Sequence, residues 1–160
     1  MKLPPKAVAL GAIGVLALLA VVIIAITNPA LLISGYETTT VEAVDGETGE
    51  SLATAEVRVA NTLIKRYVGL SATETLDDDE GMLFVHDEPG EYAYVMRDMA
   101  FGIDILFIGS DGTVTAIHEA EPESPPLTEY RGTGQYVLEV PQGWSERYGV
   151  EPGDQIRFDR

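Results

Sequence analysis

The pattern of hydrophobic positions divides the chain into an apolar N-terminal segment and a longer part in which apolar and polar residues alternate. From Ala7 to Ile26, twenty consecutive residues carry no charge and nothing more polar than glycine. A helix of that length measures about 30 Å at 1.5 Å per residue, which is the thickness of the hydrocarbon core of a bilayer. We therefore predict a cytoplasmic n-region at residues 1–6 and a single N-terminal transmembrane helix at residues 7–27.

A cleaved signal peptide is the alternative interpretation of this segment, because Lys2 and Lys6 form a positive region in front of it. Signal peptides usually have an apolar stretch of about 7 to 15 residues, followed by a cleavage site between small residues. The stretch here is longer, and residues 27–33 contain no convincing site. We expect a retained, single-pass anchor in the cell membrane, with the lysines on the cytoplasmic side and the C-terminal domain extracellular.

Residues 34–53 contain few large apolar side chains and many Thr, Gly, Asp and Glu residues, which is typical of a tether. Within it, Val41 and Val44 could form a short first strand. We predict an acidic linker over residues 28–53 and a folded extracytoplasmic domain over residues 54–160.

Short segments of the folded part alternate apolar and polar residues, as strands with one buried face do. Pro89 and Gly90 are expected to join two of these strands as a hairpin. The segment Ile103–Ile108 is interrupted only by Asp104, so we expect that strand to be covered on both faces. Strands are predicted at residues 56–60, 82–85, 92–96, 103–108, 113–118, 136–140 and 155–158.

Two short helices are predicted among the strands. Thr62 can cap a helix over residues 63–70, in which Leu63, Tyr67 and Leu70 share one face. The second is a single helical turn at residues 145–148.

Residues 119–134 hold three prolines and little apolar content, so we predict a loop or flap there. Within it, Gly132–Gly134 precedes a strand and lacks the lysine of a phosphate loop, which indicates a turn. Seven short strands with so little helix predict a mainly β fold, either a small β-sandwich or a partly closed barrel with one or two short helices.

The net charge of the chain limits the classes of partner that it can bind. Residues 28–160 contain eight basic and 26 acidic residues, a net charge of −18. This field repels phosphate backbones, so we expect no nucleic acid partner. The acids are dispersed and only three of the ten basic residues are lysine, which is typical of a halophilic surface; an ordinary acidic protein is the alternative.

Metal and cofactor chemistry finds little support in the sequence. The chain has no cysteine, which excludes disulfides, a thiol nucleophile and a thiolate metal site. The two histidines, His86 and His118, have no metal-ligand spacing, so we interpret them as surface or strand-end residues. Residues 77–80 lack the alternating ligands of a calcium loop and indicate a solvated acidic turn. We expect neither metal nor cofactor.

Several fragments together resemble the domain of unknown function 192 family, also called the UPF0127 group. They are Ala60-x-Thr62, Arg66-x-x-Gly69-Leu70, Gly81-Met82-Leu83-Phe84, Val95-Met96-Arg97-Asp98, Gly102-Ile103-Asp104-Ile105, Tyr136-Val137-Leu138-Glu139, Gly149-Val150 and Gly153-Asp154. The resemblance spans about residues 57–158 and implies a compact β domain, often exported or membrane-tethered, with no established activity. Two departures stand out: Arg97-Asp98-Met99 replaces the usual Lys-Asn-Thr, and Gly102 replaces a proline.

Four polar residues stand within otherwise apolar or motif-like segments: Arg66, Asp98, Asp104 and Glu139. One interpretation is an internal ion-pair network, because buried charges are usually retained only when they are paired. The other is a ligand-binding pocket beside Met96, in which Arg66 holds an anionic or hydroxylated ligand and the acids orient it.

No motif of a familiar catalytic class occurs in the chain, neither a Gly-x-Ser-x-Gly elbow nor a Ser-x-x-Lys pair. We therefore predict a non-enzymatic, membrane-anchored binding or accessory module of the cell envelope. Its ligand would be a small molecule, a glycan or an envelope protein. The alternative is a hydrolase-like enzyme that uses Asp98 or Asp104 as an acid or base.

Overall fold

The computed structural model describes residues 19–20, 23–24, 27 and 35–159. The chain forms two units, Met1–Ser34 and Gly35–Arg160. In the first unit the five described residues are helical. The predicted n-region and most of the predicted transmembrane helix lie outside the described residues. Within the described part of the chain, no helix is long and apolar enough to cross a membrane.

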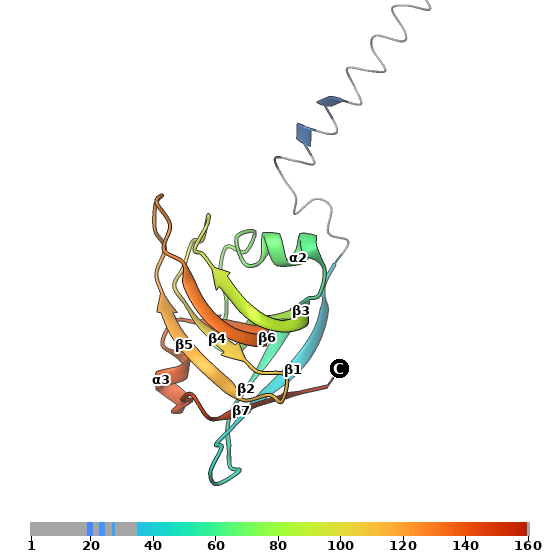
Figure 1. Ribbon diagram of the computed structural model, residues 1–160. Coiled ribbons are helices and arrows are strands. Elements are labelled where there is room, and N and C mark those ends of the chain that lie inside the picture. Colours follow the sequence, from blue (N-terminus) through green and yellow to red (C-terminus); the bar gives the residue numbers. More distant parts are fainter. Residues whose placement is uncertain (1–18, 21–22, 25–26, 28–34, 160) are drawn as a thin grey trace, which may run out of the picture. The chain divides into compact units, whose positions relative to one another are not determined.

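The second unit is built on one sheet of seven strands with two short helices (Figure 1). The strands lie in the order β5-β4-β6-β3-β2-β1-β7, and all neighbours are antiparallel except β2 and β3, which are parallel. The elements are β1 (Glu37–Val44), β2 (Ser51–Ala60), α2 (Leu63–Val68), β3 (Glu80–Tyr94), β4 (Ile103–Ile108), β5 (Val114–Ala120), β6 (Tyr130–Pro141), α3 (Trp144–Tyr148) and β7 (Gln155–Phe158).

The sheet curls until its first and last strands meet at one end. An isolated antiparallel bridge joins Thr113 to Gln155, and the N–H of Val114 donates to the carbonyl of Asp154 at 2.8 Å. The N–H of Ile156 likewise donates to the carbonyl of Gly112 at 2.9 Å. Of the two predicted architectures, the partly closed barrel is therefore the one that forms, and the sandwich is not.

Two apolar clusters lie on opposite faces of the central strands, because successive side chains of a strand point to opposite sides. The α3-side cluster includes Leu83, Leu106, Leu138 and Trp144. The α2-side cluster is made of the alternate residues of the same strands, among them Met82, Phe84, Ile105 and Val137, together with Leu70 after α2. All six residues of β4 are buried, so the prediction that this strand is covered on both faces is confirmed.

The predicted linker is wrong from Glu37 onward. Residues 37–44 form β1, which is hydrogen bonded to β2 on one side and to β7 on the other, and β2 already begins at Ser51. The short strand expected around Val41 and Val44 is the core of β1, because the side chains of Val41, Ala43 and Val44 are at most 1 % exposed. Alanine and valine suffice to bury this strand, so a low content of large apolar side chains did not mark a linker here.

The predicted hairpin at Pro89–Gly90 is also wrong, because both of its strands belong to the single fifteen-residue strand β3. The pairing of β3 with β6 shifts its register between Val85 and Gly90, and the strand is irregular there. Pro89 lies in this irregular part, where a missing N–H breaks no ladder hydrogen bond.

The predicted flap is shorter than expected, since β5 extends to Ala120 and β6 begins at Tyr130. Gly132 and Gly134 lie inside β6 rather than in a turn. A Cβ atom on Gly132 would lie 2.3 Å from the ring of Phe107, and one on Gly134 would lie 2.4 Å from the carbonyl oxygen of Ile108. At these two glycines, neighbouring groups approach the strand closely. In the sequence alone, such glycines look the same as glycines in a turn.

Both predicted helices form. Thr62 caps α2 by accepting the N–H of Lys65 at 3.3 Å, and α2 ends at Val68. Its expected apolar face is buried only at Leu70, which is 1 % exposed, whereas Leu63 and Tyr67 are 78 % and 58 % exposed. The second helix, α3, is closed by Gly149 in the left-handed conformation, with φ of 70°.

Candidate ligand-binding cavity

A cavity of about 340 Å³ lies between α2, the second half of β3 and the loop after it, with β6 contributing to its wall. Its lining is largely aromatic and apolar and includes Phe84, Tyr92, Tyr94 and Met96. Small-molecule sites are usually concave, mostly apolar and supplied with a few polar groups that fix the ligand. This cavity has that composition.

Glu139 is the most unusual of these polar groups. It projects from the central strand β6 between Met82 on β3 and Ile105 on β4, and it is 6 % exposed. Among the described residues, no hydrogen bond or ion pair reaches its carboxyl group. Burial alone raises the pKa of this carboxyl from 4.5 to about 8. The cavity wall therefore holds a carboxyl group that is largely protonated at neutral pH and lacks a protein partner.

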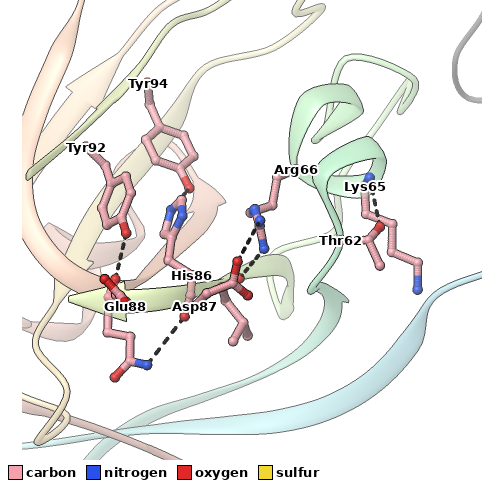
Figure 2. A network of polar contacts seen from close by, with 10 residues as sticks. Thr62, Lys65, Arg66, His86, Asp87, Glu88, Tyr92 and Tyr94 are labelled. Atoms are coloured by element: carbon pink, nitrogen blue, oxygen red, sulfur yellow. Dashed lines mark hydrogen bonds and ion pairs between the residues drawn. The ribbon is translucent and has the colours of Figure 1, made fainter. Parts of the chain in front are cut away.

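Arg66 lies on α2 at the side of the cavity, with a side chain only 13 % exposed (Figure 2). One nitrogen, Nη1, donates to the carbonyl of Val85 at 2.7 Å. The other, Nη2, lies 3.7 Å from a carboxylate oxygen of Asp87, whose side chain is 89 % exposed. An ion pair with so exposed a partner contributes little. The guanidinium keeps hydrogen-bonding capacity for a ligand.

His86 and two tyrosines of the same strand form an aromatic group in the cavity wall (Figure 2). The His86 ring stacks on Tyr92 with centroids 3.5 Å apart, and its Nε2 lies 2.9 Å from the hydroxyl of Tyr94. Burial, helped by the charge of Arg66, lowers the pKa of His86 to about 4. Burial and Glu139 raise the pKa of the Tyr94 phenol. Both groups are therefore uncharged hydrogen-bonding groups at neutral pH.

The mouth of the cavity is bordered by Tyr67 on α2 and by Arg97 after β3. The Arg97 guanidinium lies 4.1 Å from the centre of the Tyr67 ring and donates a hydrogen bond to the Tyr67 carbonyl. This contact joins the end of α2 to the segment after β3, so the two walls of the mouth hold each other in place.

The five residues proposed from sequence do not form one group. Arg66, Met96 and Glu139 line the cavity. Asp104 faces the other side of the sheet, where its two oxygens accept the N–H groups of Gly143 and Ser145 at 3.0 and 2.8 Å. Asp98 lies in an exposed turn outside the cavity, with φ of 55°. Within the described residues, the predicted internal ion-pair network is absent.

The family model described as DUF192, "Uncharacterized ACR, COG1430", matches residues 44–158. The chain belongs to the DUF192 family. A curated relative, a UPF0127 protein of Thermococcus sibiricus, is 26 % identical over 106 residues, which cover 66 % of this chain and 68 % of the relative.

Two solved structures share the DUF192 fold. A putative transcription regulator from Sinorhizobium meliloti has a TM-score of 0.72 and 31 % identity, over 79 % of this chain and 97 % of that one. A protein of unknown function from Novosphingobium aromaticivorans has a TM-score of 0.67 and 27 % identity, over 78 % and 88 % of the two chains. Because the first relative consists almost wholly of the shared region, the fold forms without an N-terminal segment like the one here.

Several of the fragments that resemble the DUF192 family contribute to the cavity. Arg66, Phe84, Met96 and Glu139 come from four separate fragments and all line it. The departure from the family pattern at Arg97 lies at the mouth, where this side chain packs on Tyr67.

Sequence reasoning missed His86, Tyr92 and Tyr94. In hindsight, the spacing of two residues between Phe84 and His86, and between Tyr92 and Tyr94, is the signal that places them on one face of a strand. The assumed hairpin hid this pattern. His86 and His118 are both half-buried, within β3 and β5, rather than surface residues. The Nε2 of His118 lies 2.8 Å from the Arg131 carbonyl. Among the described residues, no cluster of three or more potential metal ligands forms.

A second cavity of about 710 Å³ lies on the other side of β3, beside Leu83 and Val85. Its acidic residues, Glu37 and Asp159, are exposed, and no described residue in its lining is both charged and buried. It is larger than the first cavity but lacks polar groups that are both fixed and unsatisfied. The cavity with Glu139 is therefore the stronger candidate site.

Proposed function

We propose that this DUF192 protein is a membrane-anchored binding module of the cell envelope whose α2 cavity takes a small ligand. The ligand has an apolar body and offers a hydrogen-bond donor to Glu139. The Glu139 carboxyl carries this proposal, because it is buried in the cavity wall, has no protein hydrogen-bond partner among the described residues and can therefore accept a donor from a ligand in a mostly apolar site. A volume of about 340 Å³ favours a small molecule over a glycan chain or a protein.

The competing hypothesis of a hydrolase that uses Asp98 or Asp104 has less support. Asp104 is 2 % exposed, and backbone N–H groups occupy both of its oxygens. Asp98 is exposed and lies outside the cavity. Neither carboxylate lines the cavity that holds Arg66 and Glu139.

Ligand binding is tested by NMR on the ¹⁵N-labelled domain, residues 35–160, with small amines, alcohols and carboxylates that carry an aromatic ring on an alkyl chain as probes. We expect amines and alcohols to shift the amide signals of His86, Tyr94 and Met96. Amine binding tightens as the pH rises towards 8, because ionised Glu139 pairs with the ammonium group. Replacing Glu139→Gln weakens amine binding about tenfold or more, since a charge-assisted hydrogen bond is lost.

The matched control for this test is Glu151→Gln, which changes an exposed carboxylate in the turn before β7. It should leave amine binding unchanged. If no probe binds, or if the shifted amides lie away from the cavity, the proposed binding function is refuted.

Membrane anchoring is proposed from the uncharged run at residues 7–26 and the two lysines before it. We expect the protein to stay in the membrane fraction after an alkaline carbonate wash. Protease added to intact cells should degrade the domain, because the domain is proposed to lie outside. Recovery of the mature protein in the culture medium, or its survival until the cells are lysed, would refute the anchor or its orientation respectively.

A further inference from the structure

The exposed apolar side chains of the folded domain gather around α2. Within residues 35–159, five large apolar side chains are exposed, and four of them lie on α2 or directly after β3. Leu63, Ile64 and Tyr67 are 78 %, 42 % and 58 % exposed, and Val95 is 38 % exposed. Such a gathering on an otherwise polar domain marks an interaction surface.

Basic residues gather at the same place, although the domain is strongly acidic. Of the eight basic residues in residues 28–160, four lie on or beside α2. Lys65 and Arg66 lie in its last turn, Arg97 packs on Tyr67, and Arg58 lies 5.8 Å from the centre of the Tyr36 ring. Apolar side chains flanked by lysine and arginine are typical of helices that lie at a lipid headgroup surface.

The chain enters the folded domain beside this helix. Tyr36 is the second residue of the unit, and the Nζ of Lys65 lies 5.3 Å from the centre of its ring. Glu37 then accepts a hydrogen bond from Asn61, directly before α2, at 3.4 Å. The folded unit therefore begins at the end that carries α2.

We infer that the α2 surface, defined as Leu63, Ile64, Tyr67 and Val95 with Lys65 and Arg97, docks on the lipid headgroup surface of the membrane that holds the protein. The inference rests on the proposed membrane anchoring. The apolar side chains enter the interface, Tyr67 lies at headgroup depth, and the two cations contact lipid phosphates. Leu63, Tyr67, Val95 and Arg97 also line the cavity, so its mouth opens at the lipid surface and its ligand arrives from that interface.

The anchor supplies proximity, so docking requires only weak intrinsic affinity. The negative charge of the domain opposes approach to anionic lipid at long range. At 1 M salt the Debye length is about 3 Å, which removes this repulsion while apolar insertion remains.

Docking is tested by flotation of the domain, residues 35–160, with vesicles of phosphatidylcholine containing one third phosphatidylglycerol in 1 M NaCl. We expect the wild-type domain to float with the vesicles. The double variant Leu63→Ser/Ile64→Ser should partition into the vesicles at least about tenfold more weakly, since it removes two inserted side chains. Both residues are exposed, so an unchanged thermal unfolding midpoint verifies that the variant folds.

The matched control is Tyr148→Ser, because Tyr148 is the fifth exposed apolar side chain and lies on α3. This variant should float like the wild type. The absence of cysteine also allows a single polarity-sensitive probe at residue 63 or at residue 148. Vesicles should shift the emission of the first probe to the blue and leave the second unchanged.

A wild-type domain that does not float, or a double variant that floats equally well, overturns the inference. Concentration-dependent dimerisation through Leu63 and Ile64 without flotation would assign the surface to a second copy instead. The cell fractionation and the ligand titration are independent of these results. The docking inference can therefore fail while the proposed anchor and the proposed ligand binding remain supported.

Discussion

At the scale of single residues, the buried carboxyl of Glu139 makes stability depend on pH. Its pKa is about 8 in the folded protein and 4.5 in a model peptide, so the folded state binds the proton more tightly. The free energy of unfolding contributed by this group is then highest below pH 4.5, falls as the pH rises to about 8 and is constant above. The difference corresponds to at most roughly 5 kcal/mol.

Replacing Glu139→Gln keeps a neutral side chain of the same shape and removes this dependence. We expect the variant to match the wild type at pH 5 and to unfold at a temperature several degrees higher at pH 9, as measured by calorimetry. The Glu151→Gln variant should follow the wild type at both values. A difference between wild type and Glu139→Gln that is the same at pH 5 and pH 9 would show that this carboxyl does not titrate as proposed.

Only some of the residues that line the cavity could be predicted from the sequence. Arg66, Met96 and Glu139 stood out because polar groups and motif residues interrupt apolar segments, and all three line the cavity. Asp104 carried the same signal but faces the opposite side of the sheet. Successive residues of β4 and of β6 face opposite sides of the sheet. Deciding which residues of the two strands share a side requires the register in which the strands pair, and a single sequence does not contain that register.

At the scale of elements, Asp104 fastens α3 to β4. Its carboxylate accepts two N–H groups at the start of this five-residue helix, which is too short to be stable alone. In Asp104→Asn the amide NH₂ replaces one acceptor and faces an N–H donor, so we expect a loss of about 1–3 kcal/mol in urea unfolding.

The matched control is Asp98→Asn, which makes the same chemical change at an exposed site. Asparagine tolerates the positive φ of this position, so the variant should lie within about 0.5 kcal/mol of the wild type. Equal losses in the two variants would contradict the fastening role of Asp104.

The contact between β6 and β4 depends on a missing side chain. Because a Cβ atom on Gly132 would overlap the ring of Phe107, Gly132→Ala must displace a fully buried aromatic residue. We expect a loss of about 1–3 kcal/mol, measured by chemical unfolding. Gly90→Ala is the control on the neighbouring strand, where the new atom would meet Tyr92 at an ordinary 3.5 Å. If Gly132→Ala is as stable as this control, the close approach is not a constraint.

The predicted elements were most accurate where a short apolar run is bounded by turn residues. The strand at residues 155–158 and the helical turn closed by Gly149 occur as predicted. The errors at Pro89–Gly90 and at Gly132–Gly134 share a cause, because proline and glycine also occur where a long strand is irregular or closely approached. Local sequence does not separate these uses from a turn.

At the scale of the whole molecule, the dispersed acids make stability depend on salt. The net charge of −18 over residues 28–160 favours expansion of the chain, and salt screens this repulsion. We expect the unfolding midpoint in urea to rise from 0.1 M to 2 M salt, with NaCl and KCl acting alike. A midpoint that does not change with salt would contradict the proposed halophilic character of the acidic surface.

The position of β1 limits how the domain can be released from a membrane. This strand is hydrogen bonded along both sides, to β2 and to β7, although the family match begins only at its last residue, Val44. A proteolytic cut before Glu37 would shed an intact domain. A cut within or after β1 would detach a strand that is paired on both sides, expose the edges of β2 and β7, and leave a fragment prone to aggregate rather than a soluble secreted form.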